Sequence, residues 1–166
     1  MARGTLGALA GAVLIGAMFL NWYSPGEALS ALEMFEEEAG GELPVTAGDL
    51  NVTAWEAFRT VDLLLLVSGI GAIGAGLSLA LRRGLLRRPD VRRDLAGVLV
   101  VAGLLAAALI VYRWIDLPLE PLIGTLSPQA GLFIGLAAAI AITISGVLAF
   151  FAARGDQPAR PPAEER

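Results

Sequence analysis

The sequence predicts an all-α, polytopic membrane protein: a bundle of four transmembrane helices with a short extracytoplasmic amphipathic helix. Of its 166 residues, 56% are hydrophobic, and the mean hydropathy is +0.70. Soluble domains contain about 45–50% apolar residues. The chain also has four apolar runs near the length of about 20 residues that crosses a bilayer. Its arginines and its acids are concentrated in alternate connections, as the positive-inside rule describes.

The four apolar runs are predicted to be helices of one transmembrane domain, residues 1–154. The expected spans lie at about 5–23, 59–81, 94–113 and 130–153. In hydrocarbon every backbone N–H must be bonded within the protein, which favours helices. Transmembrane strands would need a period-two alternation that the sequence lacks. A signal peptide is the alternative for the first run, but Trp22, Tyr23 and Pro25 separate its apolar core from the cleavage site expected near Ala28.

The arginines determine the expected orientation in the membrane. Every basic residue is arginine, and six of them occupy one short connection: Arg82, Arg83, Arg87, Arg88, Arg92 and Arg93. This connection is predicted to face the cytoplasm. Both termini are then cytoplasmic, residues 155–166 form a disordered cytoplasmic tail, and the acidic loop 24–58 lies outside. The six arginines are also candidates for contact with anionic lipid, although topology alone explains their position.

Three local patterns mark expected helix starts near the outer surface. Ser24-Pro25-Gly26-Glu27 is a capping box that predicts the amphipathic helix, which ends at Gly40-Gly41. Thr53-Ala54-Trp55-Glu56 is a second capping box, and it lets the second helix begin before the membrane. Ser127-Pro128 is the expected start of the fourth helix.

Small residues at helical spacing are expected to let the helices approach closely. Lipid tails are as apolar as leucine, so helices associate in a membrane through close backbone contact. A dimerisation face is the alternative explanation of the same pattern. The residues concerned are Gly7, Gly11, Ala12 and Gly16; Ser68, Gly71, Ala72, Ala75 and Gly76; Gly103 and Ala107; and Gly131, Gly135 and Ala139.

Aromatic and charged residues gather at the outer ends of the spans. The candidate interfacial aromatics are Trp22, Tyr23, Trp55, Tyr112 and Trp114, because rings with one polar edge suit the headgroup level. The candidate polar cluster is Asp62, Arg59, Arg113 and Asp116. Asp62 would interact with its own helix N-terminus or pair with Arg59 or Arg113, and Arg113 would pair with Asp62 or Asp116. A structural pair is favoured over an ion or ligand site.

The composition argues against catalysis. The chain has no Cys and no His, so it offers no Cys or His metal ligands, no catalytic thiol and no imidazole base. We therefore expect no enzyme, no cofactor and no metal, and no nucleic-acid partner. The polar inventory within the spans is small: Ser68, Ser78, Thr143 and Ser145. Each hydroxyl can bond to its own helix backbone.

Several short motifs resemble blocks of uncharacterised four-span integral membrane proteins of actinobacteria. They are Phe19-Leu20-Asn21-Trp22-Tyr23, Thr53-Ala54-Trp55-Glu56-Ala57-Phe58, Asp62-Leu63-Leu64-Leu65 and Tyr112-Arg113-Trp114-Ile115-Asp116. In that family the first block has a proline where this chain has Asn21. The resemblance implies that Trp22, Trp55, Asp62 and Arg113 form one cluster at the outer face. It implies no activity.

These observations favour a structural or accessory protein that contacts the lipid bilayer and interacts with other membrane proteins or with itself. The alternative is a transporter or channel component that acts as an oligomer, with a path lined by the hydroxyls of Ser68, Ser78, Thr143 or Ser145. A sensor whose outer helix binds a ligand is a third hypothesis.

Overall fold

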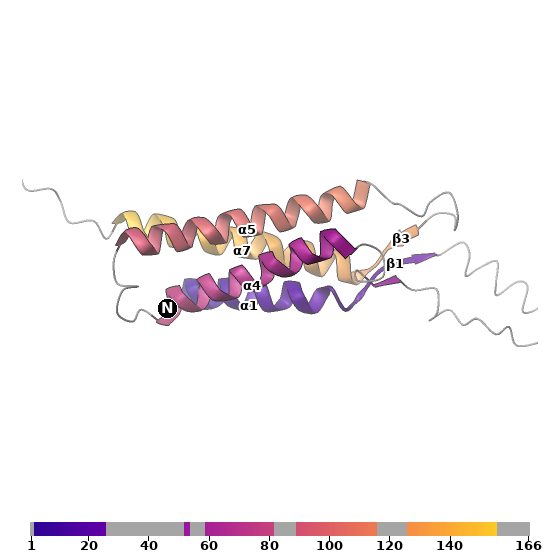
Figure 1. The fold of residues 1–166 in the computed structure, drawn as a ribbon, viewed down its shortest axis with the longest axis horizontal. Helices are drawn as coiled ribbons and strands as arrows, with labels where there is room; N and C mark the ends of the chain where they lie inside the picture. Colours follow the sequence, from indigo (N-terminus) through magenta and orange to yellow (C-terminus); the bar gives the residue numbers. More distant parts are fainter. Residues whose placement is uncertain (1, 26–51, 54–58, 82–88, 116–125, 156–166) are drawn as a thin grey trace, which may run out of the picture.

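The computed structural model describes residues 2–25, 52–53, 59–81, 89–115 and 126–155. Its four helices form an elongated bundle (Figure 1), as the sequence predicts. The helices are α1 (Ala2–Ala17), α4 (Arg59–Leu81), α5 (Pro89–Ile115) and α7 (Ala130–Gly155). They run alternately in opposite directions, so the first residues of α1 and the last residues of α7 lie at the same end, here called the termini end.

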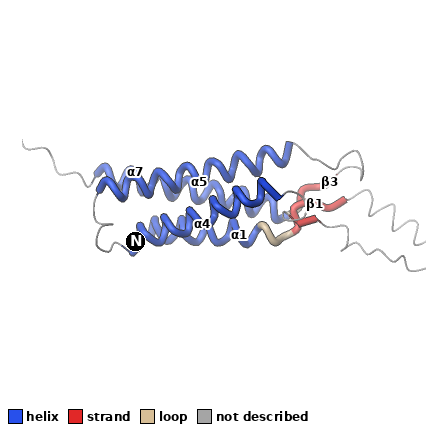
Figure 2. The backbone as a smooth tube through the Cα atoms, viewed as in Figure 1, coloured by secondary structure: helices blue, strands red, loops and turns tan. Residues whose placement is uncertain are grey.

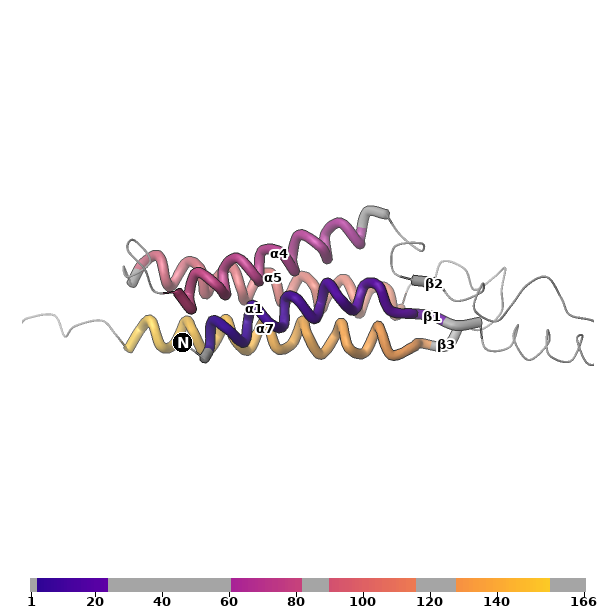
Figure 3. The backbone as a smooth tube through the Cα atoms, turned by 90° about the horizontal axis from the view of Figure 1, so that it is seen from below, coloured from indigo at the N-terminus to yellow at the C-terminus, as the bar shows by residue number. Residues whose placement is uncertain are grey.

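Each helix packs against two antiparallel neighbours. α1 contacts α4 and α7, and α5 contacts α4 and α7. In Figure 3, α1 lies between α4 and α7, and α5 lies behind them. This closed up-and-down arrangement is the ordinary topology of a four-helix bundle.

A small antiparallel sheet closes the other end of the bundle, here called the sheet end (Figure 2). Its strands are β1 (Asn21–Pro25), β2 (Val52–Thr53) and β3 (Leu126–Pro128), with β1 in the centre. Tyr23 is opposite Pro128, and the backbone N–H of Gln129 donates to the carbonyl of Trp22 at 2.8 Å. The sequence does not predict these strands, because β2 and β3 have only two and three residues and the five residues of β1 do not alternate between apolar and polar.

The first helix is shorter than the predicted span 5–23. It ends at Ala17, and the N–H groups of Met18, Phe19 and Leu20 bond back three residues at 3.1–3.2 Å. The indole Nε1 of Trp22 also donates to the Ala17 carbonyl at 2.7 Å. These bonds satisfy carbonyls at the end of the helix and redirect the chain into β1.

The other predicted helix starts are partly wrong. Ser24 and Pro25 lie in β1, so Pro25 is not the first residue of a helix. Thr53 lies in β2, and the residues that follow it in the second capping box lie outside the described part of the chain. The rest of the predicted amphipathic helix lies outside the described residues. α4 has the predicted bounds, whereas α5 begins five residues early, at Pro89. Proline suits a first helical position, and Asp90 adds a favourable charge in the first turn.

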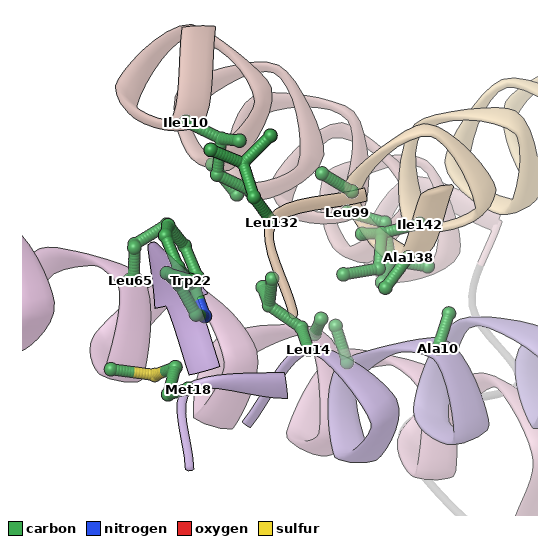
Figure 4. Packing of buried hydrophobic residues seen from close by; sticks show 14 of the residues in the cluster. Ala10, Leu14, Met18, Trp22, Leu65, Leu99, Ile110, Leu132, Ala138 and Ile142 are labelled. Carbon is green, nitrogen blue, oxygen red and sulfur yellow. The ribbon is translucent and has the colours of Figure 1, made fainter. Parts of the chain in front are cut away.

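The centre of the bundle is a single apolar cluster with contributions from all four helices and β1 (Figure 4). Among its fully buried side chains are Leu14, Met18, Trp22, Leu65, Leu99, Ile110, Leu132 and Ile142. The outer faces are apolar as well. Leu9, Val67, Val101 and Phe151 each expose more than 60% of their surface, so the bundle has the apolar exterior that lipid would solvate.

Three helical segments are long and apolar enough to cross a membrane: Val61–Leu81, Asp90–Ile115 and Ala130–Gly155. The segment Arg3–Ala17 is also apolar but shorter. The described part of the chain is thus an all-helical bundle of membrane type with a three-stranded closure at one end.

Candidate functional site at the sheet end

The most unusual side chains of the described structure meet where β1, α4 and α5 come together. Asp62 lies in the first turn of α4, and Arg113 lies in the last turn of α5. Because α4 begins and α5 ends at the sheet end, the two residues face the same region. Trp22 and Tyr23 of β1 contact Arg113 from a third element.

Asp62 and Arg113 form a buried ion pair. The distance from Nη2 of Arg113 to Oδ1 of Asp62 is 2.9 Å, and the side chains are 1% and 0% exposed. Desolvating two charges is costly, and their mutual attraction in a low-dielectric interior offsets that cost only while both partners are present. Each residue therefore depends strongly on the other for its burial.

Trp22 covers the guanidinium. The Cζ atom of Arg113 lies 5.7 Å from the Trp22 ring centroid, within the range of a cation–π interaction. Trp22 is fully buried, and its indole N–H donates a hydrogen bond to the Ala17 carbonyl. The ring is held in place by α1 and in turn holds Arg113.

Tyr23 links β1 to the end of α5. Its hydroxyl donates to the backbone carbonyl of Arg113 at 3.1 Å. That carbonyl is one of the last four of the helix, and no N–H group of the helix itself donates to these carbonyls.

The second carboxylate oxygen of Asp62 differs from the other acceptors of the cluster. Within the described ranges, Oδ2 of Asp62 has no hydrogen-bond partner. The other contacts of the cluster join three elements: the ion pair connects α4 with α5, and the Trp22 ring and the Tyr23 hydroxyl connect β1 with α5.

The structure brings together only part of the predicted polar cluster. Asp62 and Arg113 pair, which is one of the expected alternatives, and Trp22 lies beside them as the resemblance implied. Asp116 and Trp55 lie outside the described residues, as does the side chain of Arg59. The role of Tyr23 as a cap of α5 was not foreseen, because it depends on the unpredicted strand β1.

The predicted interfacial aromatics fall into two groups. Trp22 and Tyr23 are buried in the mouth of the bundle, since the chain turns inward after Ala17. Tyr112 and Trp114 are 56% and 44% exposed, and Trp114 meets Phe133 of α7 edge-on at 6.0 Å between ring centroids.

The remaining candidates are distributed over the bundle. Arg92 and Arg93 lie early in α5, and the other four arginines predicted to contact lipid lie outside the described residues. Ser68 and Thr143 donate to their own helices, at Leu64 and Ala139, whereas Ser145 donates to the Arg3 carbonyl on α1. Among the described residues, no group of three acidic, His or Cys side chains has a metal-binding arrangement.

Comparison of the chain with protein families, with curated proteins and with solved structures finds no match. The resemblance to the actinobacterial four-span proteins therefore stays a prediction.

Proposed function

We propose that the protein is a small integral membrane protein of the bacterial plasma membrane with a structural or accessory role, and that it acts by binding other membrane proteins. In this proposal all four helices cross the membrane, both termini are cytoplasmic, and no catalysis is involved. The proposal is supported most directly by an open apolar groove between two of the long helices.

The short first helix is compatible with a fourth crossing. At about 1.5 Å per residue, its 16 residues extend about 24 Å, less than the roughly 30 Å of hydrocarbon. The following residues complete the distance in a non-helical form. Non-helical backbone is tolerated at this depth where its polar groups are bonded within the protein. The N–H groups of Met18, Phe19 and Leu20 bond back to α1, and the Trp22 carbonyl accepts from Gln129.

The groove lies between α4 and α5 and has a volume of about 500 Å³. Its lining is almost entirely apolar and consists of Val67, Ser68, Gly71, Gly97, Val98, Val101, Ala102 and Leu105. A Cβ atom added at Gly71 or Gly97 would meet nothing within 4 Å. These two glycines thus leave bare backbone that no other helix of the bundle covers.

The occupant that best suits bare backbone is a transmembrane helix of a partner protein. Helices in membranes associate where small residues allow close backbone approach. An acyl chain would fill the same space without needing the glycines. We therefore assign the groove to a partner helix, and lipid alone is the competing outcome.

Photocrosslinking in native membranes tests this assignment. A photoreactive amino acid at Val101, which lines the groove, should give a defined protein adduct. The matched control is Leu104 on the same helix, which is exposed but does not line the groove. Adducts with lipid only at Val101, or equal protein adducts at both positions, would contradict the proposal.

The alternative, a transporter or channel component, remains a prediction. The hydroxyls that were expected to line its path are spread over different contacts: Ser68 borders the groove between α4 and α5, and Ser145 meets α1. Flux measurements with the purified protein in liposomes test this alternative. Solute flux that depends on Ser68 or Ser145 would favour it over the accessory role.

A further inference from the structure

The termini end carries a second group of charged and aromatic side chains. Arg93 lies in the second turn of α5, and Phe150 and Arg154 lie in the last two turns of α7. The guanidinium carbon of Arg93 is 5.1 Å from the centroid of the Phe150 ring, and that of Arg154 is 4.8 Å away. A single half-buried ring thus holds two cations that come from two helices.

The two arginines bring like charges together. Their Cζ atoms lie 5.1 and 4.8 Å from the same ring centre, so the two Cζ atoms are at most 9.9 Å apart. Within the part of the chain that the structure describes, neither forms an ion pair with a carboxylate. Asp90 and Asp94, the acids of the same region of α5, are both exposed to solvent. The ring fixes the positions of the two guanidinium groups, and no carboxylate of the described residues neutralises their charges.

We propose that Arg93 and Arg154, held by Phe150, form a clamp for the phosphate of an anionic phospholipid headgroup. Guanidinium groups bind phosphate through paired N–H···O bonds, and basic sites between transmembrane helices at the cytoplasmic side bind such headgroups. The inference goes beyond the accessory role and does not depend on a protein partner.

The surroundings favour a lipid over a free phosphate ion. The clamp lies at the end of two long apolar helices, and Phe151 beside it exposes 62% of its surface, as expected for contact with acyl chains. Arg3 of α1 extends to the same part of α7, where its Nη1 lies 3.5 Å from the Leu148 carbonyl, and adds a third cation. An anionic phospholipid would contact the apolar surface with its acyl chains and the arginines with its headgroup.

The test uses the purified full-length chain in a neutral detergent. Its binding to phosphatidylglycerol in mixed micelles is measured by native mass spectrometry and by the shift of the thermal unfolding midpoint. Arg93→Gln and Arg154→Gln should each weaken phosphatidylglycerol binding about fivefold, the equivalent of about 1 kcal/mol per arginine. Phe150→Leu should weaken it as well, although it changes no charge, because the guanidinium groups lose their support.

The matched control is Phe151→Leu, which removes the neighbouring ring and should keep binding within about twofold of the original chain, a difference of about 0.4 kcal/mol. Arg92→Gln removes an adjacent charge outside the clamp, and it should weaken binding less than Arg93→Gln does. Equal weakening by Arg92→Gln and Arg93→Gln, or no effect of Phe150→Leu, would reduce the clamp to diffuse charge and overturn the proposal. The same midpoint shift from inorganic phosphate in phosphatidylcholine micelles would overturn the lipid assignment.

Discussion

Arg113 takes part in most of the polar contacts at the sheet end. Its side chain pairs with Asp62 and lies against Trp22, and its carbonyl accepts from Tyr23. Removing one partner of a buried pair leaves an uncompensated charge in a medium that solvates it poorly. The sheet end should therefore be far more sensitive to these residues than to charges on the bundle surface.

Asp62→Asn and Arg113→Gln should each lower the free energy of unfolding by about 3–5 kcal/mol. The measurement is chemical or thermal unfolding of the purified protein in detergent. Asp94→Asn on α5 is the matched control, since it removes a charge from an exposed side chain, and its midpoint should hardly change. The double exchange Asp62→Arg with Arg113→Asp should regain part of the lost stability. If both single variants unfold like the control, the buried pair does not hold the sheet end together.

At the scale of the helices, glycines determine which pairs pack most closely. A Cβ atom at Gly76 of α4 would lie 2.5 Å from the Ala8 backbone nitrogen of α1, and Gly103 of α5 faces the Thr143 backbone of α7. Backbone atoms cannot move aside as a flexible side chain can. The contacts α1–α4 and α5–α7 therefore leave no room for a larger residue at these positions.

Gly76→Ala should destabilise the bundle by about 1–3 kcal/mol, the usual cost of overpacking. Gly74→Ala, two residues earlier on the same helix, has open space around the added methyl group. It should leave stability unchanged or raise it slightly, since glycine is a poor helix former. Unfolding midpoints of the two variants in the same detergent provide the comparison. Equal midpoints would mean that α1 and α4 are not in close backbone contact.

The sequence predicts helices better than it predicts which residues touch. The long apolar runs are sufficient to place α4, α5 and α7, because every backbone group in hydrocarbon must be bonded. Small-residue spacing correctly marks Gly11, Gly76 and Gly103 as close contacts, but Gly16 and Gly71 face no neighbour, and Gly146 was not foreseen. Spacing shows which residues share a helix face and not which face meets another helix.

The sheet end was less predictable for a related reason. The pairing of Asp62 with Arg113 is one of several alternatives that the sequence leaves open. Asp62 could also pair with Arg59, and Arg113 with Asp116, because each of these partners is three residues away along the chain. The choice depends on the antiparallel order of α4 and α5, which brings residues 51 positions apart together. The inward course of β1 depends on pairing with β3, which lies about 100 residues later.

At the scale of the whole molecule, two kinds of surface are separated along the bundle axis. The long faces are apolar, whereas charged side chains gather at both ends: Asp62 and Arg113 within the sheet end, and Arg3, Arg93 and Arg154 on the termini end. This distribution is expected of a chain solvated by lipid along its length, and the proposed orientation puts the arginine-rich end in the cytoplasm. Membrane orientation is therefore the property on which the proposed function and the lipid clamp both depend.

Cysteine accessibility in intact cells tests that orientation most directly. The chain has no cysteine, so single substitutions at Glu37, Leu86 and Ala159 report without background. A membrane-impermeant thiol reagent added outside should label Glu37→Cys only, and Leu86→Cys and Ala159→Cys should react only after the membrane is permeabilised. Labelling of Leu86→Cys in intact cells would contradict the proposed orientation, and release of the protein from vesicles by alkaline washing would contradict a bundle that crosses the membrane.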